Sequence, residues 1–224
     1  MSAAAVRKFA VLEPLSLFAL IMAYIWMLRF SHQGIWLAIL VLMLLSHAAR
    51  RERPETLGFR ARGLRACLLE FAPALTLLAL VMVACGMLFQ TTRPLHVDEA
   101  LVDWAAYLPW GLFQQYILNG YFLNRFDAVL SRRAAPVVSA ALFSSAHAPN
   151  WFLMVITLLT GYCCAGIYRR YRNLYLLAVA HATVGFLLFL VVPDSISHHL
   201  RVGPGWFHGP SHGCTGCPTT GHPG

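Results

Sequence analysis

The sequence predicts an all-α polytopic membrane protein, a single bundle of about seven transmembrane helices with a cytoplasmic N-terminus. Two observations predict this fold class. Of the 224 residues, 58% are hydrophobic and only 12% are charged, about half the charged fraction of an average soluble domain. The apolar residues also gather in long runs. A soluble globular enzyme is therefore excluded, and so is a disordered chain, because disorder requires low hydrophobicity and high net charge.

Apolar runs that approach the length of a membrane span define the expected helices. A span needs about 20 residues, because a helix rises ~1.5 Å per residue and the hydrocarbon layer is ~30 Å thick. In order, the runs are Ala10–Met27, Ile35–Ala49, Ala66–Phe89, Tyr107–Leu123, Ala135–His147, Trp151–Tyr168 and Leu174–Val192. The second and fifth are short for full spans. The first follows basic residues, as a signal peptide does, but it is too long and lacks a cleavage site, so we interpret it as an uncleaved anchor.

The basic residues predict the orientation. If the seven runs alternate across the membrane from a cytoplasmic N-terminus, every Lys and Arg lies inside except Arg29, Arg93 and Arg201. This bias is the one that cytoplasmic loops show. The net charge of +8 is then explained by orientation and by contact with membrane lipids. No nucleic-acid partner is expected.

Three regions follow from the composition. Residues 1–106 carry the N-terminal membrane helices and their loops, of which 50–65 and 91–106 are the long ones. Residues 107–192 form a core, and residues 193–224 form a flexible tail rich in His, Cys, Gly and Pro. Cys214 and Cys217 in this tail leave a disulfide, a metal site and no role at all as alternatives. Cysteines in the apolar runs usually behave as small hydrophobes, so Cys163 and Cys164 are assigned no role.

Polar side chains inside the apolar runs are the candidate functional residues, because an unpaired polar group in hydrocarbon is costly and usually faces the bundle interior. Gln115 and Asn119 are four residues apart and share a helix face, with Gln114 beside them. Two other runs carry His147 and His181. Neutral imidazole is both a metal ligand and an acid or base near neutral pH. The alternative for the amide cluster is a hydrogen-bond clasp between helices.

The order of these elements resembles the CAAX prenyl protease and bacteriocin-processing (CPBP) family of intramembrane proteases. In that family Glu-Glu-x-x-x-Arg on one helix is followed by Phe-x-x-x-His on the next and by a late His, usually as His-x-x-x-Asn. Phe143-x-x-x-His147 matches the second motif and His181 the third. The resemblance covers residues 107–192. It implies an intramembrane endopeptidase that acts on a membrane protein or peptide, in a bacterial inner (cell) membrane.

The sequence departs from the family pattern at four positions. Gln114 and Gln115 replace the paired glutamates, Asn119 replaces the arginine, and Gly185 replaces the last asparagine. In the family's proposed mechanism a glutamate activates water, while histidines position it, bind a metal or stabilise the oxyanion. A carboxamide cannot accept that proton, so a general-base step worth about 10² to 10⁴ in rate loses its expected residue.

The resemblance implies a set of site residues. The catalytic group is expected to be Gln114, Gln115, Asn119, His147 and His181. Asn150 and Phe143 are expected to contact substrate, and His147 and His181 to bind a divalent metal such as zinc.

Three interpretations stay open: a hydrolase in which a histidine is base or ligand, a pseudoprotease that binds a peptide or lipid and regulates a partner, and a different reaction or transport. Glu13 or Glu70 could supply the missing base, although carboxylates near a membrane interface more often snorkel to water or pair with a loop arginine.

Overall fold

A computed structural model describes residues 3–94 and 96–207, in which every regular element is a helix. The predicted all-α class is confirmed. The α-helices are α1 (Ala3–Ala23), α2 (Ile35–Ala49), α3 (Leu64–Leu88), α4 (Val97–Gln115), α5 (Asn124–Asp127), α6 (Ala134–Ser145), α7 (Trp151–Tyr171), α8 (Leu174–Val191) and α9 (Asp194–Ser197). π-Helical stretches extend α1 over Tyr24–Leu28 and α4 over Tyr116–Leu123, and short 3₁₀ turns occupy His198–Leu200 and Gly203–Trp206.

Four of the described helices are long and apolar enough to cross a membrane. They cover Ala10–Leu28, Leu64–Leu88, Trp151–Tyr171 and Leu174–Val191. Ile35–Ala49 and Ala134–Ser145 are apolar but shorter, as expected for the second and fifth runs. The count of seven spans and the cytoplasmic N-terminus stay predictions.

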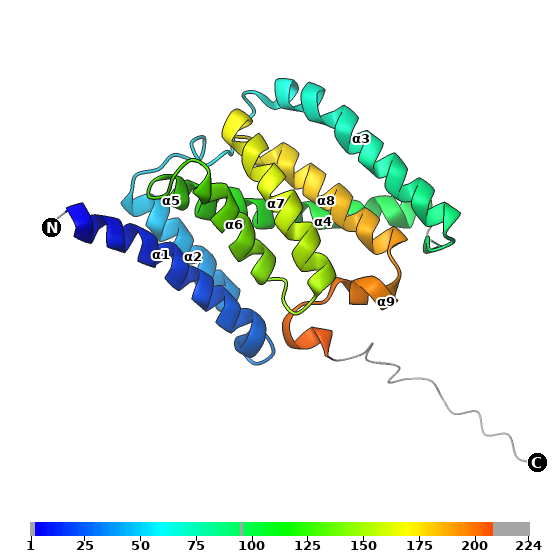
Figure 1. The fold of residues 1–224 in the computed structure, drawn as a ribbon, viewed down its shortest axis with the longest axis horizontal. Helices are drawn as coiled ribbons and strands as arrows, with labels where there is room; N and C mark the ends of the chain where they lie inside the picture. The colour runs from blue at the N-terminus through cyan, green and yellow to red at the C-terminus, as the bar shows by residue number, and fades with distance from the viewer. Residues whose placement is uncertain (1–2, 95, 208–224) are drawn as a thin grey trace, which may run out of the picture.

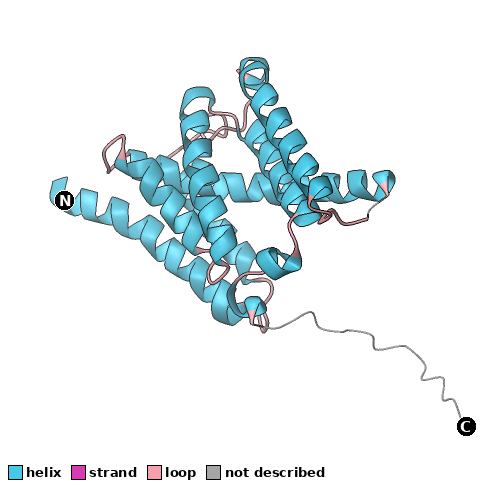
Figure 2. Cartoon of the chain, turned by 45° about the vertical axis from the view of Figure 1, so that its right-hand side comes forward, coloured by secondary structure: helices cyan, strands magenta, loops and turns pink. Residues whose placement is uncertain are grey.

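The helices are arranged around a central group (Figure 1). α1 and α2 lie together on one side, α3 lies on the opposite side, and α6, α7 and α8 stand between them (Figure 1). Figure 2 shows the described residues as helices joined by loops. α4 packs most extensively against α8, and α6 against α7. Gly111 lets α4 approach α8 closely, because a Cβ at this position would lie 2.9 Å from the Ala178 carbonyl oxygen. This close approach brings the amide cluster to the helix that carries His181.

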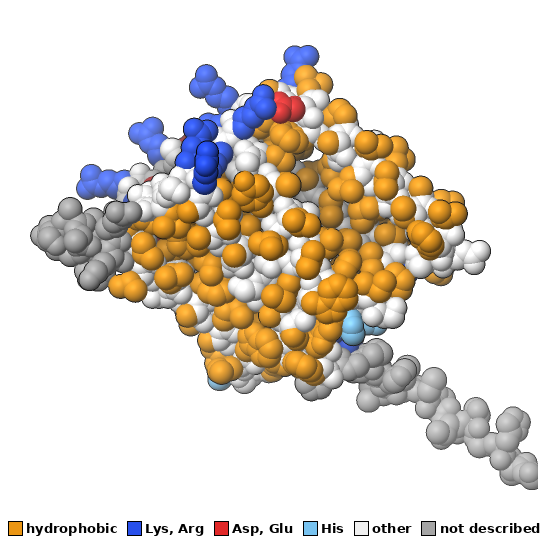
Figure 3. Space-filling model, viewed as in Figure 1, with side chains coloured by type: hydrophobic (Ala, Val, Ile, Leu, Met, Phe, Trp, Pro, Cys, Tyr) orange, Lys and Arg blue, Asp and Glu red, His pale blue; other side chains and the backbone are white. Residues whose placement is uncertain are grey.

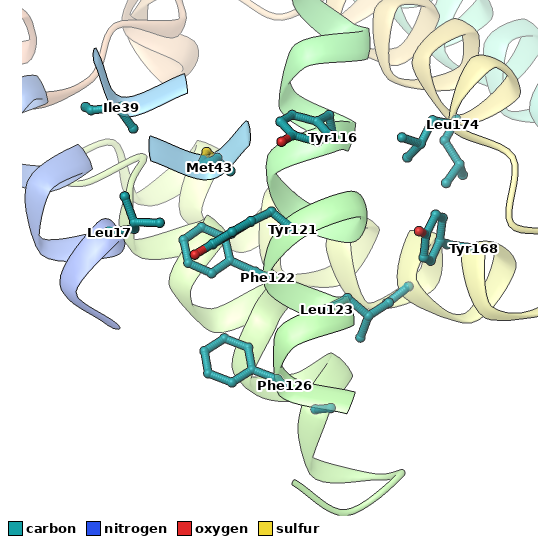
Figure 4. Close-up of a cluster of buried hydrophobic side chains, with 13 residues drawn as sticks. Leu17, Ile39, Met43, Tyr116, Tyr121, Phe122, Leu123, Phe126, Tyr168 and Leu174 are labelled. Carbon is teal, nitrogen blue, oxygen red and sulfur yellow. The ribbon is translucent and has the colours of Figure 1, made fainter. Parts of the chain in front are cut away.

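The core surrounds the π-helical stretch Tyr116–Leu123, whose residues are all buried except Ile117. Tyr121 and Phe122 from this stretch meet Leu17 of α1 and Met43 of α2, and Tyr168 of α7 approaches from the other side (Figure 4). π-Helical turns are rare and occur frequently at functional sites. The core therefore lies directly beside the polar residues predicted for the site.

The predicted loop over residues 91–106 is wrong for most of its length, because α4 begins at Val97. Asp98 and Glu99 lie in its first turn, where negative charge is favoured by the helix dipole and by the free backbone N–H groups. Both residues fall within the long loop that the sequence predicts over 91–106. The expected boundary between residues 106 and 107 falls inside this helix.

The predicted tail begins later than residue 193, because residues 194–206 fold into α9 and the two 3₁₀ turns. Ser197 is fully buried. The Asn150 Nδ2 donates hydrogen bonds to the Ser197 and Arg201 carbonyl oxygens at 2.9 and 3.1 Å. This segment packs against the turn between α6 and α7. Cys214 and Cys217 lie outside the described residues.

A buried arginine connects α5 to α2 and the following loop. Arg125 is only 4% exposed, and its Nη1 and Nη2 donate to the two carboxylate oxygens of Glu52 at 2.8 Å each. Its Nη2 also lies 2.9 Å from His47 Nδ1. Burial would raise the pKa of Glu52, but the hydrogen bonds from Arg125 and His47 outweigh burial and lower it. The sequence places Arg125 with the basic residues on the cytoplasmic side of the membrane. In the structure its side chain is buried and paired within the protein.

Candidate functional site

A chain of hydrogen bonds joins Asn119, Gln115 and His181. Asn119 Nδ2 donates to Gln115 Oε1 at 2.8 Å, and Gln115 Nε2 lies 3.1 Å from His181 Nδ1. An amide nitrogen can only donate, so His181 Nδ1 is the acceptor and the ring proton is on Nε2. Gln115 is 2% exposed and Asn119 is fully buried, whereas His181 is partly exposed. The chain therefore fixes the tautomer of His181 and leaves its Nε2–H as a donor.

His147 has the opposite tautomer. Its Nδ1 lies 2.8 Å from the Phe143 carbonyl oxygen, and a carbonyl oxygen can only accept, so Nδ1 carries the proton and Nε2 has a free lone pair. The Phe143 ring contacts both imidazoles, with centroid separations of 4.9 Å to His147 and 6.4 Å to His181. The two histidines thus flank one aromatic ring and present one proton acceptor and one proton donor.

Tyr107 is a site residue that sequence reasoning missed. Its ring stacks on His181 with centroids 6.4 Å apart and an interplanar angle of 29°. A Cβ at Gly185 would lie 2.7 Å from Tyr107 Cε1 and 3.4 Å from its hydroxyl oxygen. The tyrosine therefore occupies the space beside the position of the family's asparagine. Its spacing is the signal that could have found it, because residues 107, 111, 115 and 119 recur every four positions on one face.

Two further polar contacts lie near the amide chain. Gln115 Nε2 is 3.9 Å from Cys164 Sγ on α7, so a cysteine to which the sequence assigned no role borders the site. Trp104 Nε1 donates to Thr183 Oγ1 at 3.1 Å, a second polar link between α4 and α8. Asn119 Oδ1 is buried and has no hydrogen-bond partner among the described residues. The site therefore retains one unused acceptor.

Two predicted site residues are not brought into this arrangement. Gln114 is partly buried, and its side chain makes no hydrogen bond with any residue in 3–94 or 96–207. Asn150 is fully buried, and its Oδ1 accepts the Leu153 N–H at 3.1 Å to cap α7. Its amide nitrogen also donates to carbonyl oxygens of the 194–206 segment. Asn150 therefore stabilises the fold at this turn and has no part in the mechanism proposed below.

The two carboxylates considered as substitutes for the missing base have partners elsewhere. Glu13 pairs with Arg50, the residue directly after α2, and accepts from the Tyr121 hydroxyl at 2.9 Å. Glu70 pairs with Arg170 at 2.6 Å and accepts from the Tyr171 hydroxyl. Each carboxylate is thus paired with an arginine near a helix end and does not supply the missing base at the histidine site.

The residues present do not fit a divalent metal as they stand. Among the described residues, no group of three or more His, Cys, Asp or Glu could hold a metal ion. A metal would need the lone pairs of both imidazoles, but the hydrogen bond from Gln115 places a proton on Nε2 of His181. The mechanism proposed below therefore uses no metal.

These features define a class, a helical membrane protein with a neutral histidine and carboxamide site between its helices. The family follows from comparison: the model of the Type II CAAX prenyl endopeptidase Rce1-like family matches residues 55–187. The chain belongs to this family, which confirms the resemblance seen in the motifs, and it is an integral membrane protein of a protease family. No curated protein and no solved structure matches the chain.

Proposed function

We propose that this protein is an intramembrane endopeptidase of the CPBP type that hydrolyses a peptide bond in a membrane-associated substrate, in the bacterial inner membrane. The observation that supports this most directly is the complementary pair of tautomers at His147 and His181. Acyl transfer to water needs a base for the water and a donor for the oxyanion. Partly exposed imidazoles on α8 and in the turn after α6 offer one of each.

The proposed reaction uses these two rings. His147 Nε2 accepts a proton from water as the water oxygen bonds to the substrate carbonyl carbon. The His181 Nε2–H donates a hydrogen bond to the oxygen that becomes negative. His147 then returns the proton to the leaving nitrogen, and the carbon–nitrogen bond breaks. Gln115 and Asn119 act as positioning residues, because they hold His181 in its donor tautomer.

A second candidate is a catalytically inactive pseudoprotease that binds a membrane peptide or lipid and regulates a partner. The specific observation in its favour is that Gln115 and Asn119, at positions where the family has charged residues, bond to each other and to His181 in a buried chain without any ionised group. Such a chain stabilises the helix contact without any need for catalysis.

The experiment measures cleavage of a panel of model transmembrane peptides reconstituted in vesicles with the full chain, by mass spectrometry. We expect His147→Ala to reduce the rate by about 10² to 10⁴, the usual value of a general base. His181→Ala should reduce it by about 10² to 10³, the usual value of one oxyanion donor. His32→Ala changes an exposed histidine and is the matched control. Wild-type rates in both site variants would overturn the proposal.

The pseudoprotease has its own signature. The wild-type chain would cleave none of the peptides, and the triple variant Gln114→Glu/Gln115→Glu/Asn119→Arg, which restores the family motif, would gain cleavage. The metal prediction is checked in the same assay by adding EDTA and then zinc. The proposed mechanism requires that neither addition changes the rate.

A further inference from the structure

A groove lies between the start of α6 and the last turns of α7, apart from the histidine site. Its volume is about 440 Å³. Arg132, Arg133 and Arg169 line it together with Pro136, Tyr162 and Gly166. Basic side chains and an apolar wall therefore share one surface depression.

The arginines leave this groove positively charged. Arg169 is paired with Asp127, to which its Nε donates at 3.1 Å. Arg132 and Arg133 are exposed, and neither side chain has an ion pair within the part of the chain that the structure describes. Figure 3 shows Lys and Arg side chains gathered at one edge of the molecule, directly beside a broad hydrophobic surface. Two positive charges thus stand without a protein anion.

The wall of the groove is apolar and open. Tyr162 is 53% exposed, and a Cβ at Gly166 would meet no atom within 4 Å. From Tyr162 to Arg169 the wall extends seven residues along α7, or ~10 Å. α7 is one of the helices long enough to span a membrane, and Arg169 lies in its last turn. In a membrane that α7 spans, the arginines would lie at the depth of the lipid headgroups, and the wall would lie beside the acyl carbons nearest to them.

We propose that this groove binds one anionic glycerophospholipid, with its phosphate between Arg132 and Arg133 and an acyl chain along Gly166 and Tyr162. Charge complementarity selects the headgroup, because guanidinium groups donate paired hydrogen bonds to phosphate oxygens, and basic pockets between membrane helices bind anionic headgroups. The apolar wall selects a lipid over a free phosphate. The site does not depend on whether the histidine pair is catalytic.

The test measures retention of phosphatidylglycerol by the purified full chain in detergent, using native mass spectrometry, with phosphatidylcholine as the neutral comparison. The double variant Arg132→Gln/Arg133→Gln should weaken phosphatidylglycerol binding roughly 25-fold, since each arginine near a membrane surface is worth about fivefold. The matched control is Arg62→Gln/Arg65→Gln, which removes the same charge from two exposed arginines outside the groove. Equal losses in both double variants would show a general charge effect and overturn the proposal.

The acyl wall is tested at Gly166. Gly166→Leu fills the open space and should weaken phosphatidylglycerol binding at least about fivefold, whereas Gly166→Ala leaves room and should bind as the wild type does. Both changes are in a helix interior and favour the helix, and unchanged thermal unfolding verifies the fold. Competition by glycerol 3-phosphate or inorganic phosphate as strong as that by the lipid would overturn the acyl-chain contact, as would unaltered binding to Gly166→Leu.

Discussion

The close contact between Gly185 and Tyr107 predicts that the effect of Gly185→Ala on stability depends on the tyrosine. Gly185 lies inside α8, and replacing a helical glycine by alanine normally stabilises a helix by about 1 kcal/mol. Here the added Cβ would lie 2.7 Å from Tyr107 Cε1, well inside van der Waals contact. Overpacking of this kind costs about 1–3 kcal/mol. If overpacking costs about 2 kcal/mol and the helix gains about 1 kcal/mol, Gly185→Ala should destabilise the wild-type chain by about 1 kcal/mol.

Removal of the ring should reverse the effect. In a Tyr107→Ala background the space beside Gly185 is empty, so Gly185→Ala should stabilise the chain by about 1 kcal/mol. The coupling energy between the two positions is therefore about 2 kcal/mol, within the range measured for residues in contact. The assay is a denaturant titration in mixed micelles, followed by tryptophan fluorescence, on the four chains of the cycle. The same sign in both backgrounds would refute the close packing of Tyr107 on α8.

Two further predictions concern the buried arginine. Arg125→Met should reduce the free energy of unfolding by about 3 kcal/mol, the lower end for a buried ion pair, because Glu52 loses its bidentate partner but is itself 26% exposed. The same titration measures the change, and a loss below about 1 kcal/mol would contradict the pairing. Stability should also fall in acid. The folded pKa of Glu52 is lowered, so its contribution is complete above its unfolded pKa of about 4.3 and is lost as the pH falls through the folded value. Unfolding temperatures from pH 7 to 3 should show a steeper fall for the wild type than for Glu52→Gln.

Most of the fold could be predicted from the apolar runs. Ile35–Ala49 and Trp151 as the start of α7 agree with the structure to the residue, because these helices begin where apolar residues begin. The start of α4 was missed because Asp98, Glu99 and Asp103 make its first turns polar. Low hydropathy over such a turn suggests a loop, although acidic residues are favoured at a helix N-terminus.

The site could be predicted only as far as spacing determines it. Gln115 and Asn119 share a face at an interval of four, and their hydrogen bond follows. Which ring atom of His181 they meet depends on how closely α4 approaches α8, and this depends on Gly111. The role of Tyr107 could not be derived from the motif, because the motif begins seven residues later. The α9 segment was missed for a different reason: its burial comes from contacts with Asn150, far away in sequence.

The four departures from the family motif are best understood as one change. A glutamate beside His181 would require a positive partner, and the arginine that supplies it in the family would be an unpaired charge in the membrane without the glutamates. Replacing both by carboxamides keeps the hydrogen bonds and removes every charge. The loss of asparagine at position 185 fits the same arrangement, because the space is taken by Tyr107, which packs on His181. The catalytic interpretation therefore depends on the free lone pair of His147, since no other described side chain at the site can accept a proton from water.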